Sequence, residues 1–194
     1  GQQPRPAGSP PRLLTAGMMR RGNKEACYRT LADALARLAD RDWQLTIAGD
    51  GAAADDIRPR FDPARTTFLG AVDKDRMAGV YAGADLFVWP AINEPFGLVF
   101  LEAQASGLAV VGGRTRGVPE VVEDGVTGIL VEPGDAAAFA GAISELIGDA
   151  TCRWRTAEAA RTRALARHDI AQATDALSAI LQAAAAHHAA ALAE

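Results

Sequence analysis

The chain has 194 residues, of which 49% are hydrophobic and 23% are charged, with 19 glycines and 10 prolines. This composition is that of an ordinary globular protein, and it excludes disordered and fibrous proteins. A chain of this length buries roughly 70% of the surface that its unfolded state exposes, so its core needs no disulfide or metal. The net charge is −4, with 20 basic residues dispersed among 24 acidic ones, which argues against a nucleic-acid partner.

Neither the most apolar stretch of the chain nor its first residues predict a membrane helix or a signal peptide. Residues 98–111 are the most apolar, but Glu102 and Gln104 interrupt them. Residues 1–11 are rich in proline and lack the apolar centre of a signal peptide. We interpret residues 1–11 as a linker, or as a remnant of cloning, in front of the folded domain.

The two cysteines, Cys27 and Cys152, form no CxxC pair and belong to no Cys/His cluster. We expect both to be buried or partly buried thiols in a reducing compartment, which indicates a cytoplasmic protein.

From residue 12 to residue 168, short apolar runs alternate with amphipathic stretches, which predicts a doubly wound α/β domain with a mainly parallel, Rossmann-like sheet. The predicted strands are 13–16, 44–48, 66–69, 86–89, 109–111 and 128–131. The predicted helices begin near Lys24, Ala52, Asp73, Phe96, Asp135 and Thr151, and an alanine-rich helix occupies 169–194.

The ends of these helices carry the expected residues. Asp73 and Asp135 are predicted N-caps, and Gly107 is predicted to close a helix in a left-handed conformation. Ligands of such sheets bind beyond the carboxyl ends of the strands. The loops to inspect are therefore 17–23, 49–51, 70–73, 90–96 and 112–119.

The first of these loops is basic. Residues 17–24 come within one position of the phosphate-binding pattern GxxxxGK[ST], but Asn23 stands where the lysine is required. What remains is a glycine-bearing loop with Arg20, Arg21 and Lys24. It is suited either to bind a diphosphate or simply to be solvated, and these residues alone do not decide between the two.

Two other short motifs have simpler structural interpretations. Gly49 and Gly51 resemble part of a dinucleotide-binding fingerprint but follow the second strand, so we interpret them as a tight turn. Asp73 and Asp75 match the metal-binding DxD pattern, but they stand where a helix begins, so we interpret them as an N-cap and a first-turn acid.

The segment 89–103 carries the strongest functional signal. Pro95 disfavours helical geometry at Glu94, which therefore belongs to a loop, whereas Glu102 falls in about the second turn of the following helix. The free amides of that helix start can donate to a phosphate, and the carboxylates on either side can accept from hydroxyls. A glutamate buried among apolar neighbours needs a partner, which a ribose diol would supply. In the alternative interpretation, Glu102 is a mid-helix residue that faces solvent.

These residues resemble a known family. Residues 94–102 look like the E-x7-E motif of the retaining glycosyltransferases of family 4 (glycosyl transferases group 1), which have the two-domain GT-B architecture. The resemblance extends from about residue 13 to residue 167. Its supporting segments are 13–24, 45–51, TTFLG at 66–70, YAGADLFVWP at 81–90 and GVPEVVEDGVTG at 117–128.

The resemblance implies that this chain is the C-terminal, donor-binding half of such an enzyme, and that an N-terminal acceptor-binding half lies outside it. Glu94 would hold hydroxyls of the donor sugar, and Glu102 the ribose. The amides of Phe96, Gly97 and Leu98 would meet the sugar and diphosphate, the base would lie near Leu69, Gly70, Ala71 and Val72, and Gly17 and Asp50 would also border the donor. Two positions depart from the family pattern: Met18 replaces an expected arginine, and Arg116 replaces a frequent glycine. Whether Arg20 or Arg21 takes over from that arginine stays open.

The implied reaction moves a sugar from a nucleoside diphosphate sugar to an acceptor hydroxyl with retention of configuration. Arg20 or Arg21, Lys24 and the helix amides would stabilise the leaving diphosphate without a metal or other cofactor. We expect a bacterial protein, and its full-length form is compatible with peripheral association with a membrane. The alternative is a nucleotide-sugar-binding or regulatory module without catalysis of its own. A phosphorylase or an epimerase of the same architecture is a weaker alternative, because a phosphorylase would need a cofactor lysine in a sequence context that this chain lacks. The nucleotide, the sugar and the acceptor stay open.

Overall fold

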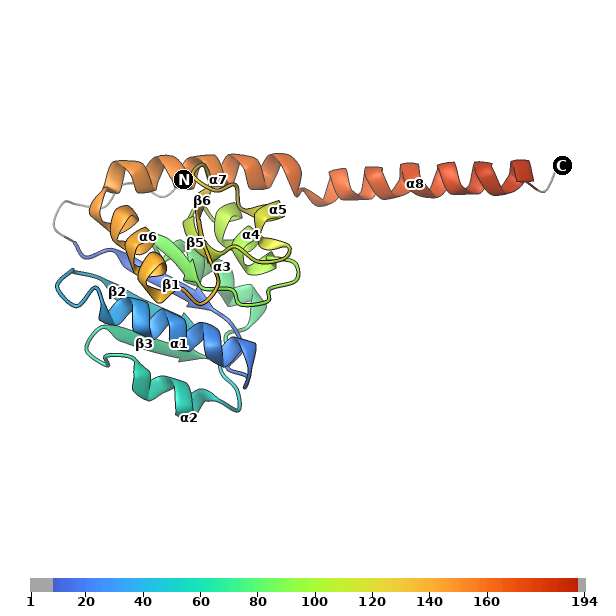
Figure 1. Ribbon diagram of the computed structural model, residues 1–194. Helices are drawn as coiled ribbons and strands as arrows, with labels where there is room; N and C mark the ends of the chain where they lie inside the picture. The colour runs from blue at the N-terminus through green and yellow to red at the C-terminus, as the bar shows by residue number, and fades with distance from the viewer. Residues whose placement is uncertain (1–8, 192–194) are drawn as a thin grey trace.

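The computed structural model describes residues 9–191, and its strands form one sheet (Figure 1). The proposed linker therefore lies outside the described residues except for positions 9–11. All strand pairings in the sheet are parallel, and the order is β3-β2-β1-β4-β5-β6. The strands are β1 (Arg12–Ala16), β2 (Gln44–Ala48), β3 (Thr66–Gly70), β4 (Leu86–Trp89), β5 (Ala109–Gly113) and β6 (Gly128–Val131). The six predicted strands and the parallel sheet are thus confirmed.

The strand order reverses between β1 and β4, which are neighbours although two strands separate them along the chain. Leu13 of β1 pairs with Leu45 of β2 on one side and with Leu86 of β4 on the other. This order is that of dinucleotide-binding folds, and its reversal opens a crevice at the carboxyl ends of β1 and β4.

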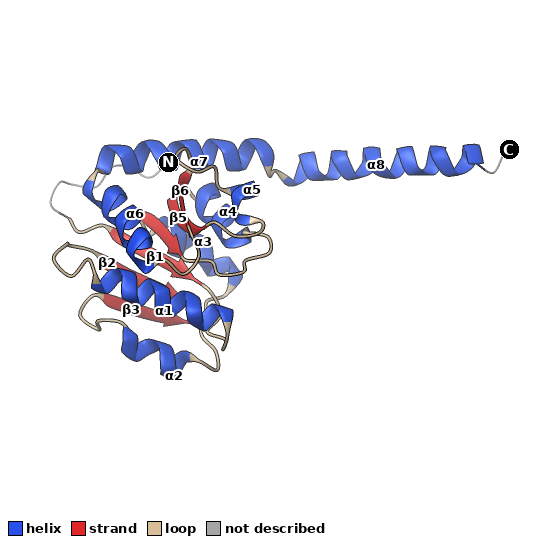
Figure 2. Ribbon diagram, in the orientation of Figure 1, coloured by secondary structure: helices blue, strands red, loops and turns tan. Residues whose placement is uncertain are grey.

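Helices cover both sides of the sheet, as Figure 2 shows. Helix α1 packs against α6, and α4 packs against α7. The helices are α1 (Asn23–Ala36), α2 (Ala54–Ile57), the 3₁₀ helix η1 (Arg58–Arg60), α3 (Lys74–Ala82), α4 (Leu98–Ala105), α5 (Val118–Val121), α6 (Ala136–Gly148), α7 (Ala150–Arg167) and α8 (Ile170–Ala191). The seven predicted helices are all present, whereas η1 and α5 are too short to show a helical period in the sequence.

The helix ends refine the predictions. Asp135 caps α6 by accepting from the amides of Ala137 and Ala138. Asp73 stands at the N-cap of α3 but makes no capping hydrogen bond with its side chain. Gly107 has the predicted left-handed conformation, with φ of 84°.

The core lies along the central strands. Every residue of β4 is fully buried, as are Leu13 and Leu14 of β1. Strands of a parallel sheet are covered on both faces, which explains why these runs are continuously apolar rather than alternating. The buried strands therefore fix the position of the strand ends, where the loops around the crevice begin.

Helix α8 extends away from the rest of the molecule in Figure 1. Its large apolar side chains Ile170, Leu177, Ile180 and Leu181 are exposed. Among residues 9–191, no helix is both long and apolar enough to cross a membrane.

Candidate functional site

A cleft of about 530 Å³ lies at the carboxyl ends of β1, β2, β3 and β4. It contains eight of the residues that the sequence singled out: Gly17, Lys24, Asp50, Ala71, Val72, Glu94, Leu98 and Glu102. Four of its other lining residues, Met18, Met77, Tyr81 and Val99, were not predicted as site residues. The strand-end loops thus converge on one concave surface, as the fold class requires.

Lys24 and Glu94 both line this cleft and form an ion pair. The Lys24 Nζ lies 2.8 Å from the Glu94 Oε2, and the Glu94 side chain is only 15% exposed. The Lys24 ammonium also lies over the ring of Trp89, 5.1 Å from its centroid. A cation from the start of α1 therefore holds a carboxylate from the loop after β4 in a defined orientation.

The loop that presents Glu94 has an uncommon backbone. Ala91 and Asn93 adopt positive φ angles of 50° and 60°. Between them, the amide of Ile92 donates to the Sγ of Cys27 at 3.1 Å. Burial raises the pKa of the Cys27 thiol, so this sulfur accepts the hydrogen bond as a neutral thiol. Such local strain persists only where surrounding contacts hold it, and it is common at functional sites.

Two turns that border the cleft, at Gly17 and at Gly49, approach each other closely. The Tyr28 hydroxyl donates to the Gly17 carbonyl at 2.6 Å. A Cβ atom on Gly49 would lie 1.9 Å from that carbonyl oxygen, and one on Gly51 would lie 2.5 Å from the Met19 oxygen. The interpretation of Gly49 and Gly51 as a tight turn is confirmed, since backbone occupies the space that a side chain would need.

Glu102, on α4, also lines the cleft. Its Oε2 accepts a hydrogen bond of 2.9 Å from the Tyr81 hydroxyl of α3. The expectation that Glu102 is buried among apolar neighbours is wrong, because its position in the second turn of α4 leaves it exposed. The alternative, a solvent-facing residue, is correct, but the solvent that Glu102 faces is that of the cleft.

The start of α4 differs slightly from the prediction. The helix begins at Leu98 rather than Phe96, because Gly97 at its N-cap has a left-handed φ of 70°. Leu98 and Val99 line the cleft, so it borders the first turn of α4, where amides have no acceptor within the helix. Phe96 is exposed and lies outside the lining residues, as do Gly97, Leu69 and Gly70.

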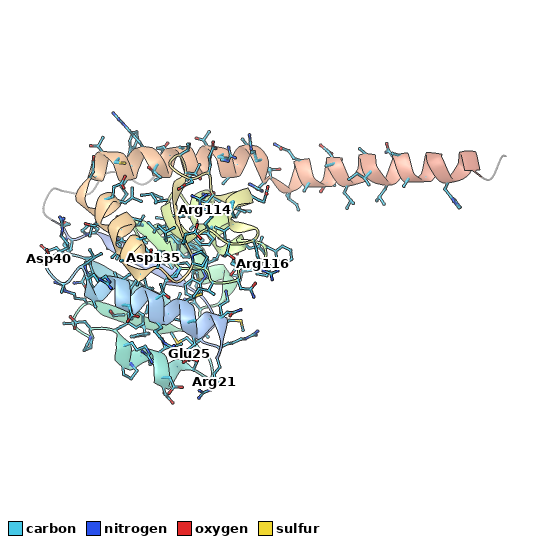
Figure 3. The ribbon with its side chains drawn as sticks, viewed as in Figure 1. Arg21, Glu25, Asp40, Arg114, Arg116 and Asp135 are labelled. Atoms are coloured by element: carbon cyan, nitrogen blue, oxygen red, sulfur yellow. The ribbon has the colours of Figure 1, made fainter. Side chains whose placement is uncertain are left out.

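The two arginines of the basic loop lie outside the cleft. Arg21 pairs with Asp56 of α2 at 3.1 Å, and both side chains are more than half exposed. Figure 3 shows Arg21 at the outer edge of the molecule. Arg20 is also exposed, and within residues 9–191 its side chain enters no ion pair. The exposed Met18 lies at the cleft instead.

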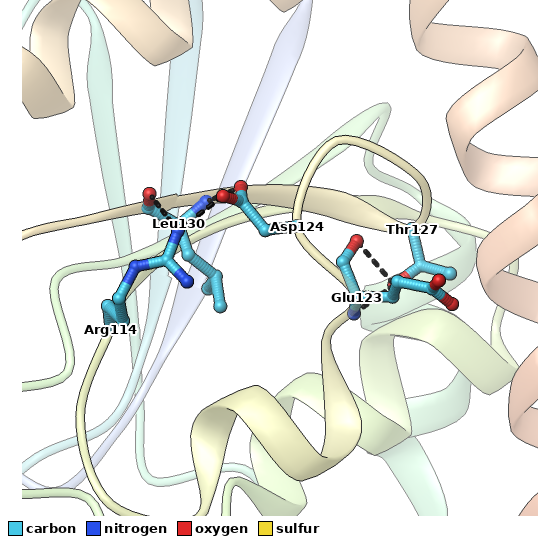
Figure 4. Close-up of polar contacts among 5 residues, drawn as sticks. All are labelled: Arg114, Glu123, Asp124, Thr127 and Leu130. Atoms are coloured by element: carbon cyan, nitrogen blue, oxygen red, sulfur yellow. Dashed lines mark hydrogen bonds and ion pairs between the residues drawn. The ribbon is translucent and has the colours of Figure 1, made fainter.

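The loop between β5 and β6 is held by a polar network, drawn in Figure 4. Arg114 forms an ion pair with Asp124, which also accepts from the Leu130 amide at 2.8 Å. Partial burial raises the pKa of Asp124, but the hydrogen bonds from Leu130 and Arg114 outweigh it and hold the pKa below its usual range. Arg116, where the family often has glycine, adopts a positive φ of 43°. This is a conformation that glycine adopts without steric cost.

No group of three or more His, Cys, Asp or Glu side chains within the described part of the chain is arranged to hold a metal ion. Asp73 and Asp75 are the N-cap and a first-turn residue of α3, as their structural interpretation predicts.

Comparison with known proteins identifies the family. The model of the family "Glycosyl transferases group 1" matches residues 10–149. The chain is 38% identical over 144 residues to a D-inositol 3-phosphate glycosyltransferase of Corynebacterium diphtheriae, covering 70% of this chain and 34% of the relative. It is also 38% identical over 126 residues to a glycogen synthase of Mycobacterium tuberculosis, covering 61% of this chain and 30% of that protein.

Solved structures agree. Sucrose-phosphate synthase from Thermosynechococcus elongatus superimposes with a TM-score of 0.79 at 30% identity, over 92% of this chain and 47% of that one. The Anabaena protein HepE, in complex with UDP and glucose, gives a TM-score of 0.75 at 26% identity, over 88% of this chain and 48% of that one. The chain thus spans about a third of these curated relatives and about half of these solved chains. It belongs to the glycosyl transferases group 1 family, and its fold is that of the C-terminal half of a GT-B enzyme.

Proposed function

We propose that this chain is the donor-binding half of a retaining, family 4 glycosyltransferase that moves a sugar from a nucleoside diphosphate sugar to an acceptor hydroxyl. The observation that carries the proposal is the cleft at the strand reversal, where the Lys24–Glu94 pair and Glu102 line one surface. A cation flanked by two carboxylates suits a ligand with an anionic centre and hydroxyls at both ends. The E-x7-E spacing of Glu94 and Glu102 and the family membership support the same conclusion.

The transfer requires the bond between the anomeric carbon and the diphosphate to break. Negative charge then develops on the leaving diphosphate, and the sugar becomes oxocarbenium-like. In our proposal Lys24 and the first amides of α4 stabilise that charge, and Arg20 or Arg21 adds to the field. Glu94 holds sugar hydroxyls rather than acting as a nucleophile. Because these groups supply the positive charge, the proposed reaction uses no metal and no other cofactor.

The rest of the active site belongs to the partner half. The acceptor and any general base would lie on an N-terminal domain outside this chain, and the exposed apolar residues of α8 would pack across it. The two free cysteines support a reducing, cytoplasmic location. A bacterial source and association of the full-length protein with a membrane surface are parts of the same proposal.

Calorimetric titration of the chain with UDP, GDP and ADP tests the donor site. We expect one of them to bind, with an affinity that falls as ionic strength rises, because the diphosphate meets the Lys24 ammonium at the cleft. Binding of none of the three would overturn the proposal. Sugar transfer by the full-length protein then separates an enzyme from a binding or regulatory module, which would bind the nucleotide without turnover.

A further inference from the structure

Tyr81 lies behind Glu102 and was not among the predicted site residues. It is 3% exposed, and its hydroxyl donates to the Glu102 Oε2 at 2.9 Å. Burial, together with the negative charge of Glu102, raises the pKa of the Tyr81 phenol. The hydroxyl therefore keeps its proton at neutral pH, and it is available as the donor to the carboxylate.

Aromatic packing fixes the direction of this hydroxyl. The Tyr81 ring lies 6.1 Å from that of Phe87, and the Phe87 ring contacts Phe100 edge to face at 5.7 Å. Phe87 and Phe100 are fully buried, and Phe100 lies two residues before Glu102 on α4. The same aromatic cluster thus holds both the ring that carries the donor hydroxyl and the helix that carries its acceptor.

We propose that Tyr81 is a positioning residue, which holds Glu102 so that its carboxylate receives the hydroxyls of the donor ribose. The proposal rests on the proposed function. Both residues line the cleft, yet only Tyr81 is buried. An exposed glutamate without such a contact samples several rotamers, and the ligand has to select one of them. With Oε2 held by Tyr81, the carboxylate is oriented before the ligand arrives.

The test compares each of UDP, GDP and ADP with its 2′,3′-dideoxy form, measured by calorimetry on the chain. For the nucleotide that binds, we expect the dideoxy form to bind at least about tenfold more weakly, because it lacks the hydroxyls that a carboxylate accepts. Tyr81→Phe is expected to weaken binding of the ribonucleotide by roughly fivefold to tenfold. It should change the affinity for the dideoxy form by less than about twofold. Loss of preference for ribose, rather than loss of affinity in general, is therefore the signature.

A double-mutant cycle shows whether Tyr81 acts through Glu102. Glu102→Gln should reduce the ribose preference, and Tyr81→Phe added to Glu102→Gln should reduce it no further. Glu102→Asp shortens the side chain that accepts the hydrogen bond by one methylene. It is expected to reduce the preference for ribose as Tyr81→Phe does, without altering the core. It serves in place of Tyr81→Phe if that variant does not fold. Tyr28→Phe removes the other tyrosine hydroxyl, which holds Gly17, and should affect both forms of the nucleotide equally.

The outcomes separate the two proposals. If the wild type binds no nucleotide, the proposed function itself fails. If it binds ribo and dideoxy forms equally, nucleotide binding stands and the ribose role of Glu102 and Tyr81 is wrong. If Tyr81→Phe weakens both forms to the same degree, or neither, Tyr81 is a structural residue only and the inference is overturned.

Discussion

The Lys24 Nζ and the Glu94 Oε2 lie 2.8 Å apart, although 70 residues separate the two side chains along the chain. The contact joins the first turn of α1 to the loop after β4, and it exists because β1 and β4 are neighbours in the sheet. Partly exposed ion pairs contribute little to folding stability. The main consequence of the Lys24–Glu94 contact is therefore geometric, since it orients both groups in the cleft before a ligand arrives.

Removal of either partner should impair the reaction. In the full-length protein, Lys24→Ala and Glu94→Gln are each expected to reduce sugar transfer by at least about tenfold, because in the proposed function Lys24 stabilises the leaving group and Glu94 holds the sugar. Initial rates of transfer measure the effect. Arg29→Ala is the matched control, since it removes a cation from an exposed position of the same helix. Unchanged transfer in both cleft variants would contradict the proposed function.

The two arginines of the basic loop should contribute differently to binding of the nucleoside diphosphate. Arg21 is engaged with Asp56, whereas Arg20 enters no ion pair within the described residues, so we expect Arg20 to turn toward a bound diphosphate. Arg20→Ala should weaken binding of the nucleoside diphosphate several-fold, and Arg21→Ala by less than about twofold. Calorimetry at two salt concentrations measures both. A larger loss in Arg21→Ala would show that the ion pair with Asp56 opens on binding.

The turn at Gly49 should tolerate no side chain. Gly49→Ala would place a Cβ 1.9 Å from the Gly17 oxygen at a φ of 153°, so we expect it to lower the free energy of unfolding by at least about 2 kcal/mol. Urea unfolding followed by circular dichroism provides the measurement. Gly141→Ala is the matched control: it lies within α6, a Cβ there meets no atom within 4 Å, and it should stabilise by roughly 0.5–1 kcal/mol. Equal effects of the two substitutions would contradict the close approach.

The Asp124 network should make stability depend on pH in the acid range. Because the pKa of Asp124 is lower in the folded protein than in the unfolded chain, its stabilisation is fully present above the unfolded value of about 3.9. That stabilisation is lost as the pH falls through the folded pKa. The difference in free energy of unfolding between wild type and Asp124→Asn should therefore be largest near neutral pH and disappear in acid.

Arg114→Gln checks the cause of that pH dependence. Without the guanidinium, the pKa of Asp124 should rise toward its ordinary value, so the acid loss of stability should become smaller and be complete at a higher pH. Urea unfolding of the three proteins between about pH 2 and pH 7 gives both results. An Asp124→Asn difference that grows as the pH falls would show that the sign is wrong.

Local patterns in the sequence were sufficient for the element order and for the placement of both glutamates. The alternation of apolar runs and helical stretches located all six strands. A strand such as β4 is buried on both faces and is therefore a short continuous apolar run in the sequence. Pro95 predicted that Glu94 lies in a loop, and the structure places it there. The start of α4 was predicted two residues too early, since the local pattern did not show that Gly97 adopts a positive φ and becomes the N-cap.

Local sequence patterns could not predict the contacts between distant segments. The sequence by itself determined the strands of the sheet and the loops between them. It also determined that a basic loop and two carboxylates follow the carboxyl ends of the strands. Only the tertiary structure decided that Lys24 meets Glu94, that Arg21 turns to Asp56, and that the buried Tyr81 stands behind an exposed Glu102. The physical reason is that residue type and spacing limit which backbone conformation a segment adopts. A side chain's partner, by contrast, is set by the strand order, which brings together loops far apart in the chain.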